Sequence, residues 1–251
     1  MPIPHLRIRG KIHYTSDKAE RKGQERGREY FTVTRHGDGR RTLRAYTEID
    51  DAPNVMRDVT LSFGADWKPH DCFVRISVGD EFRGSSWFLF SEHEAVCEGF
   101  TVGEGRISQR YPLKRALAGF GTHPIAADAL LTSIVPTAQG PNRGVYHDVL
   151  MCSLDHRGAT GPMLMTHPLG VRLAFIGKEK ITVTAGTFDA LHFRFSEAES
   201  DAETRNEPGK HPPYDLWCTA DGEYTFLLAY VTGYMATRYE LTEYERIEAR
   251  P

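Results

Sequence analysis

The feature that most constrains this chain is the alternation of apolar and polar residues along runs of strand length, broken by Gly, Asp, Pro and Asn. Residues 5–14, for example, place Leu6, Ile8, Ile12 and Tyr14 in such a run. Successive side chains of a β-strand point to opposite faces, so a period of two gives each strand one buried face. The pattern therefore predicts an all-β protein.

Runs of this kind recur along the whole chain. Residues 29–50 predict a hairpin that turns at the sequence HGDG, and residues 71–100 predict three strands. Further predicted strands cover residues 55–63, 105–112, 144–153, 170–186, 187–197, 214–221, 224–232 and 234–246. We expect a single large antiparallel meander that curls into a barrel or half-barrel, because closure removes exposed strand edges.

Two segments depart from the strand pattern. Residues 113–135 have Ala and Leu at near-helical spacing and predict an irregular crossing with one or two helical turns. Residues 196–213 are acid-rich and then proline-rich, which predicts a mobile polar insertion. The chain shows no internal repeat and no domain boundary, so residues 1–251 are expected to form one β-barrel domain.

Composition excludes several partners. The 251 residues include 31 Lys and Arg against 34 Asp and Glu, so charge gives no case for nucleic acid or for an anionic membrane surface. No stretch approaches the roughly 20 apolar residues of a membrane span, and the first residues lack the apolar core of a secretory signal. We expect a cytoplasmic protein in which the four dispersed cysteines are reduced, buried thiols.

The C-terminal third carries the stretches IGKEKITVTAGTFDALHFRF, PYDLWCTADGEYTFLLAY and YELTEYE. They resemble a bacterial family of uncharacterised antiparallel β-barrels related to the periplasmic lipoprotein-carrier fold. The resemblance covers residues 170–245 and is only architectural before them. The carrier-like relatives are exported proteins that hold lipid or acyl chains in a concavity. This chain departs from them in its expected lack of a leader and in two histidine-bearing loops, so the resemblance implies a fold rather than a function.

Three stretches interrupt the strands with mixed polar chemistry, and the first is EIDDAPNVMRD. Asp51 ends one strand, and Arg57 opens the next on its apolar face. A solvated turn capped by Asp51 explains the stretch without a function. In the functional interpretation, Arg57 lies in the barrel mouth and binds substrate together with Asp51, because a buried guanidinium needs an anionic partner such as Asp51 or a ligand oxygen.

The second stretch is GFGTHPIAADAL. Gly119 and Gly121 permit unusual backbone angles, and Pro124 stiffens the chain directly after His123. Asp128, five residues further on, is a candidate to orient the imidazole and to bind substrate. A structural role and a functional role remain equally open for this segment.

The third stretch, SLDHRGATGP, sets Asp155, His156 and Arg157 side by side. An Asx turn made by Asp155, with Arg157 in solvent, explains it structurally. The functional alternative is a rim loop that presents His156 as a general acid or base and Arg157 to an oxyanion. We predict these three residues and His123 as the catalytic set.

Other motifs are missing from the sequence. There is no GxSxG nucleophile turn and no Gly-rich strand-to-helix unit for a nucleotide. HxH, HxxxH and HExxH are absent as well, although a metal site assembled across strands would leave no local trace. We therefore predict neither a cofactor nor a metal.

The function predicted from these features is cofactor-independent acid–base chemistry by a lyase, isomerase or dehydratase. Its substrate would be a small, largely apolar molecule, aromatic or isoprenoid-like, held in the barrel. A non-catalytic barrel that binds a lipid or hydrophobic metabolite, and a structural or partner-binding protein, remain as alternatives. Several charged residues around the largest pocket would favour the enzyme, whereas a pocket without charged residues would favour the carrier. Each of these three functions is compatible with a homodimer that forms through edge strands or an exposed face.

Overall fold

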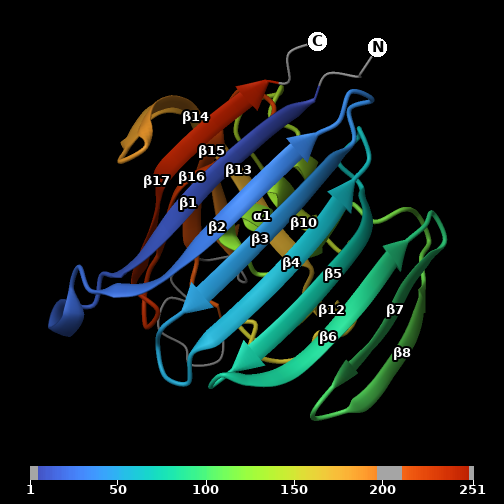
Figure 1. Cartoon of the computed structure of the whole chain (residues 1–251). Helices are drawn as coiled ribbons and strands as arrows, with labels where there is room; N and C mark the ends of the chain where they lie inside the picture. Colours follow the sequence, from blue (N-terminus) through green and yellow to red (C-terminus); the bar gives the residue numbers. More distant parts are fainter. Residues whose placement is uncertain (1–4, 197–210, 249–251) are drawn as a thin grey trace.

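The computed structural model describes residues 5–196 and 211–248. Within those ranges, fourteen strands form one antiparallel sheet. Figure 1 shows the sheet curving around a single short helix, α1 (Ile125–Leu131), which lies behind it in this view. The all-β prediction is confirmed.

The sheet is built from two meanders rather than one. The first contains β1 (Leu6–Ser16), β2 (Glu25–Arg35), β3 (Arg41–Ile49), β4 (Val55–Phe63), β5 (Pro69–Val78), β6 (Glu81–Phe90), β7 (Glu94–Thr101) and β8 (Gly105–Pro112). The second contains β13 (Val171–Val183), β14 (Gly186–Ser196), β15 (Tyr214–Thr219), β16 (Phe226–Val231) and β17 (Thr237–Glu248). A one-turn 3-10 helix, η1 (Ala19–Arg21), lies between β1 and β2.

The first and last strands join the two meanders, because β1 pairs with β2 on one side and with β17 on the other. The sheet then ends at β8 on one edge and at β10 (Asn142–Tyr146), which pairs with β13, on the other. These two end strands do not pair with each other in the described part of the chain, so the sheet is a half-barrel.

Alternation places apolar residues on the concave face, as predicted. In β4, Val55, Val59, Leu61 and Phe63 are buried at alternate positions. Arg57 occupies the remaining inward position of this strand and is only 1% exposed. A charged side chain therefore lies among the apolar residues of the core.

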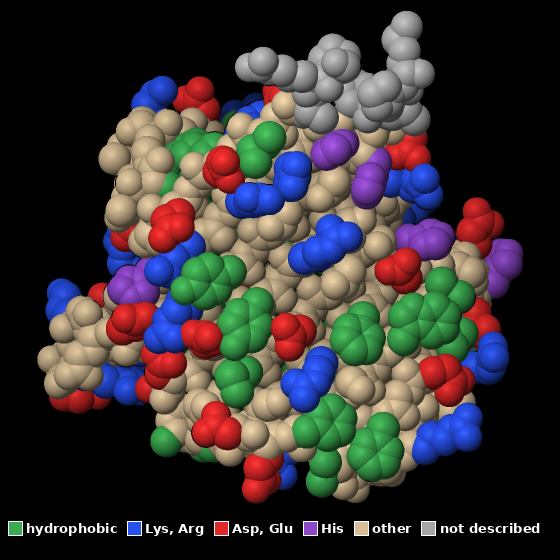
Figure 2. Space-filling model, in the orientation of Figure 1, with side chains coloured by type: hydrophobic (Ala, Val, Ile, Leu, Met, Phe, Trp, Pro, Cys, Tyr) green, Lys and Arg blue, Asp and Glu red, His purple; other side chains and the backbone are tan. Residues whose placement is uncertain are grey.

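The outer face also carries apolar side chains, and they gather over β5 to β8 (Figure 2). Phe73 and Trp87 lie opposite each other on β5 and β6, and each is 43% exposed. The outer face of this region is therefore not uniformly polar.

The segment between the two meanders crosses the concave side. It contains β9 (Gly119–Gly121), α1, the 3-10 helix η2 (Thr132–Ile134), β10, β11 (Val149–Met151) and β12 (Met165–Thr166). Strands β12, β11 and β9 form a small second sheet, and α1 contacts β3, β15 and β16. The predicted crossing over 113–135 is confirmed, whereas the strand expected over 144–153 is divided into β10 and β11. Most of the insertion predicted at 196–213 lies outside the described residues.

Candidate functional site

A cavity of about 960 Å³ lies on the concave side, between α1, the loop that precedes β12 and the ends of several strands. This volume is at the upper end of the range usual for small-molecule sites. Six of the seven predicted site residues line it: Arg57, His123, Asp128, Asp155, His156 and Arg157. Arg57 and Arg157, which are a hundred positions apart in the sequence, therefore meet at one site.

Asp51 is the predicted residue that does not line this cavity. It accepts hydrogen bonds at 2.8 Å from Arg21 Nη1 and at 2.7 Å from Arg26 Nε. Although partial burial opposes the effect, these bonds lower the pKa of Asp51. The carboxylate is thus paired with two rim arginines rather than with Arg57.

The Arg57 guanidinium is buried against the backbone of the loop that contains residues 153–162. Its Nη2 donates a 2.5 Å hydrogen bond to the carbonyl oxygen of Arg157. Its Nε has no hydrogen-bond partner among the described residues, and Glu29 and Asp155 attract the guanidinium without forming an ion pair with it. A buried charge without a counter-ion is costly, so this residue requires a reason beyond packing.

His123 is held in an unusual backbone conformation, with φ at 75° immediately before Pro124. Its Nε2 donates to the carbonyl oxygen of Ser153 at 3.2 Å, which leaves Nδ1 as the acceptor nitrogen of the neutral ring. Burial, followed by the charge of Arg57, lowers the pKa of His123 to about 3. The imidazole is therefore neutral at physiological pH, and Ser153 rather than Asp128 orients it.

Asp128 projects from α1 into the same cavity. Its Oδ2 accepts a 2.7 Å hydrogen bond from the Tyr214 hydroxyl. Burial raises the pKa of Asp128 to about 7, in spite of the opposing effect of that hydrogen bond. A carboxyl group with this pKa is present in both protonation states near neutral pH, as a general acid or base requires.

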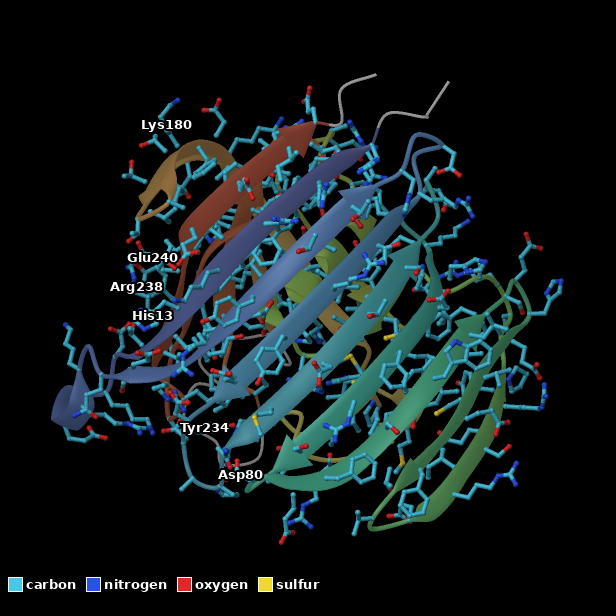
Figure 3. All side chains as sticks on the ribbon, in the orientation of Figure 1. His13, Asp80, Lys180, Tyr234, Arg238 and Glu240 are labelled. Carbon is cyan, nitrogen blue, oxygen red and sulfur yellow. The ribbon has the colours of Figure 1, made fainter. Side chains whose placement is uncertain are left out.

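Asp155 and His156 have different environments within their loop. Asp155 Oδ2 accepts a 2.6 Å hydrogen bond from the backbone amide of Ala159, and the amide of Gly158 donates to its carbonyl oxygen. His156 is exposed at the cavity mouth, where its ring lies 6.1 Å from that of Tyr234. Figure 3 shows Tyr234 at the end of the half-barrel where β3 leads into β4. Asp155 therefore shapes the loop, and His156 borders the entrance.

Arg157 binds the loop to the connection between β3 and β4, and Gly158 allows it to pack closely against neighbouring side chains. Arg157 Nη2 donates to the carbonyl oxygens of Asp51 and Pro53, at 2.7 and 2.5 Å. Gly158 has φ at 59°, and a Cβ atom there would lie 2.7 Å from both Arg57 Cζ and His123 Cδ2. The glycine is needed because the loop backbone lies directly on these two side chains.

Sequence reasoning missed Glu29, a fully buried residue of β2. Its carboxylate accepts hydrogen bonds from the Tyr14 hydroxyl at 2.7 Å and from the backbone amides of Ile125 and Ala126 at 2.8 and 3.0 Å. Burial raises the pKa of Glu29, and these bonds oppose the rise. The carboxylate caps the first turn of α1 and thereby positions Asp128. The only signal in the sequence was an acidic residue at an inward position of a strand.

Two further properties concern the described part of the chain. Its His, Cys, Asp and Glu side chains form no group of three that would hold a metal ion. None of its helices has the length and hydropathy needed to cross a membrane.

Comparison with known proteins supports the fold assignment. No family model matches the chain, and no curated protein matches it in sequence. Among solved structures, it is similar to a β-barrel-like protein of domain of unknown function DUF1849 from Brucella abortus. The TM-score is 0.56 at 12% sequence identity, and the match covers 98% of each chain. The likeness is one of fold. It confirms the predicted resemblance to an uncharacterised bacterial β-barrel domain.

Proposed function

We propose that the cavity binds a small, largely apolar molecule and that Asp128 and His123 exchange protons with it. The reaction class that fits is a cofactor-independent lyase, isomerase or dehydratase reaction. The observation that carries the proposal is that Asp128, His123 and Arg57 converge on the wall of one cavity, where burial raises the pKa of Asp128 to about 7. Perturbed carboxyl groups that converge with other ionisable residues in one cavity are typical of catalytic sites.

Each group has a distinct role in this proposal. Asp128 acts as the general acid or base, since its pKa is close to neutral pH. His123 is neutral and offers its Nδ1 as an acceptor, which becomes a stronger base when a ligand offsets the charge of Arg57. Arg57 stabilises negative charge that develops on a substrate oxygen. Arg157 is not assigned this role, because its Nη2 already binds two backbone carbonyls.

A non-catalytic binding barrel is the second candidate. Its support is the apolar share of the cavity wall, which includes Ile125, Leu131, Met151, Phe195 and Val231.

We also propose that the protein is located in the cytoplasm. All four cysteines are unpaired and buried, as is common for proteins of reducing compartments.

The test is a screen of aromatic and isoprenoid compounds, first for a rise in melting temperature and then for conversion followed by ¹H NMR. We expect at least one stabilising compound to be converted. Asp128→Asn and His123→Asn should bind it and convert it slowly, whereas Asp58→Asn, at an exposed position on the outer face of β4, should match the wild type. Compounds that bind to the wild type and are all recovered unchanged would refute catalysis and favour the binding barrel.

A further inference from the structure

Arg57 is a buried cation that forms no direct ion pair with a carboxylate of the described residues, although Glu29 and Asp155 attract it from a greater distance. The side chain is 1% exposed, and one carbonyl oxygen, that of Arg157, accepts from its Nη2. Its Nε is shielded from solvent and has no partner. Proteins rarely bury a guanidinium without a carboxylate or phosphate against it.

The neighbouring acidic groups make their direct contacts elsewhere, so none of them fills the place of an ion-pair partner for Arg57. Asp128 is only partly ionised at neutral pH, because burial raises its pKa to about 7. Glu29 is engaged by Tyr14 and by the first amides of α1. Asp155 accepts from the amide of Ala159. Each carboxyl group near Arg57 therefore has another partner or is partly protonated.

The cavity wall contains a second cation with a buried nitrogen that has no hydrogen-bond partner among the described residues. Arg172, on β13, lines the cavity, and its buried Nε has no hydrogen-bond partner in the described ranges. His156 stands at the mouth. The ionisable groups of the wall are thus mainly basic, and their field attracts an anion.

We propose that the ligand of this cavity carries a carboxylate group, which pairs with Arg57, and an apolar body, which lies along the wall. This inference rests on the proposed function only in taking the cavity to be a binding site. A carboxylate is favoured because its planar pair of oxygens matches the fork of one guanidinium. The apolar body fits side chains such as Ile125, Leu131 and Val231.

Such a ligand would complete the site. The carboxylate supplies the direct ion-pair partner that Arg57 lacks, and it offsets the field that opposes protonation of His123. If the ionised Asp128 carboxylate accepts a proton from the carbon next to the ligand's carboxylate, the electron pair of the broken C–H bond is delocalised onto the carboxylate oxygens that Arg57 already holds.

The experiment compares matched pairs of probes by isothermal titration calorimetry at one fixed salt concentration. Cinnamate and cinnamamide form the aromatic pair, and geranate and geranamide form the isoprenoid pair. Each acid has the same apolar body as its neutral amide, so the difference within a pair isolates the charge. The proteins are the wild type, Arg57→Met, Arg57→Lys and the control Arg44→Gln, which changes an exposed arginine on the outer face of β3.

We expect the wild type to bind at least one carboxylate roughly 10- to 100-fold more tightly than its amide, the range for hydrogen bonds to charged groups. Arg57→Met should remove that preference and leave the affinity for the amide unchanged. Arg57→Lys keeps the charge but loses the forked pair of donors, so it should keep only part of the preference, whereas Arg44→Gln should keep all of it. If Arg57→Met does not fold, a preference for the acid over the amide in the wild type that falls in Arg57→Lys and not in Arg44→Gln still supports the inference, and a preference equal in all three proteins overturns it.

Equal affinity for acid and amide, or a preference that survives in Arg57→Met, would overturn the inference that a ligand carboxylate pairs with Arg57. Either result would leave the proposed catalysis untouched. No binding of any probe would also overturn it. A carboxylate that binds through Arg57 and is recovered unchanged supports the inference while it contradicts the proposed catalysis.

Discussion

The carboxyl group of Asp128 makes the stability of the protein depend on pH in a direction that is unusual for an aspartate. Its pKa is about 7 in the folded protein, because burial disfavours the charged form. In the unfolded chain, the pKa of an aspartate is about 3.9. The folded state therefore holds this proton more tightly, and Asp128 stabilises the fold most at pH values below about 4.

The magnitude follows from linkage. The stability contributed by protonated Asp128 is lost as the pH rises from about 4 through about 7, and the dependence is flat above that. A difference of about three pKa units corresponds to about 4 kcal/mol over the whole range, and to about 3 kcal/mol between pH 5 and pH 8. Asp128→Asn removes the ionisation but keeps an oxygen to accept from Tyr214, so it should be more stable than the wild type at pH 8.

The assay is urea denaturation of both proteins at pH 5 and pH 8. We expect the free energy of unfolding of Asp128→Asn, relative to the wild type, to increase by about 3 kcal/mol between these two pH values. Asp58→Asn, on the outer face, is the control and should follow the wild type at both. A difference between Asp128→Asn and the wild type that does not change with pH would show that Asp128 has an ordinary pKa, and the proposed acid–base role would fail.

Three substitutions test the structure around the cavity. Glu29→Gln places an amide NH₂ group against the amides that begin α1, and should lower the free energy of unfolding by about 1–3 kcal/mol in urea titrations; an unchanged value would contradict the capping role. Gly158→Ala forces a Cβ against Arg57 and His123 at a positive φ, and should lower the melting temperature by several degrees, so a variant as stable as the wild type would show that the loop does not pack there. Arg157→Gln removes the bonds to two backbone carbonyls, and should speed hydrogen exchange in residues 153–162 with little effect on global stability; exchange unchanged from the wild type would argue against this anchor.

Most of the fold could be predicted because period-two alternation is a local signal. In β4, it placed Val59, Leu61 and Phe63 on the buried face and Arg57 among them, and the structure confirms each position. Pairing between β1 and β17 was not predictable in the same way. It depends on contacts between residues more than two hundred positions apart, for which a single sequence holds no local signal.

The candidate site could be predicted residue by residue but not as an arrangement. Conspicuous loop residues such as His123 and His156 were identified from their neighbours in sequence, and both line the cavity. The hydrogen-bond partners of these residues were not identified from the sequence. His123, for example, binds the Ser153 carbonyl rather than Asp128. Glu29 was missed because a buried carboxylate in a strand resembles an ordinary surface residue until the helix that it caps is placed beside it.

The central claim is that Asp128 transfers protons to and from a molecule held in the cavity. The most direct measurement follows deuterium incorporation from D₂O into the C–H bonds of a compound already shown to bind, with the wild type and Asp128→Asn compared at equal saturation. We predict that the wild type exchanges or converts the compound roughly a hundredfold faster than the variant, the lower end of the range for a general acid or base. Equal rates in the two proteins, or no exchange in either while binding persists, would contradict the account.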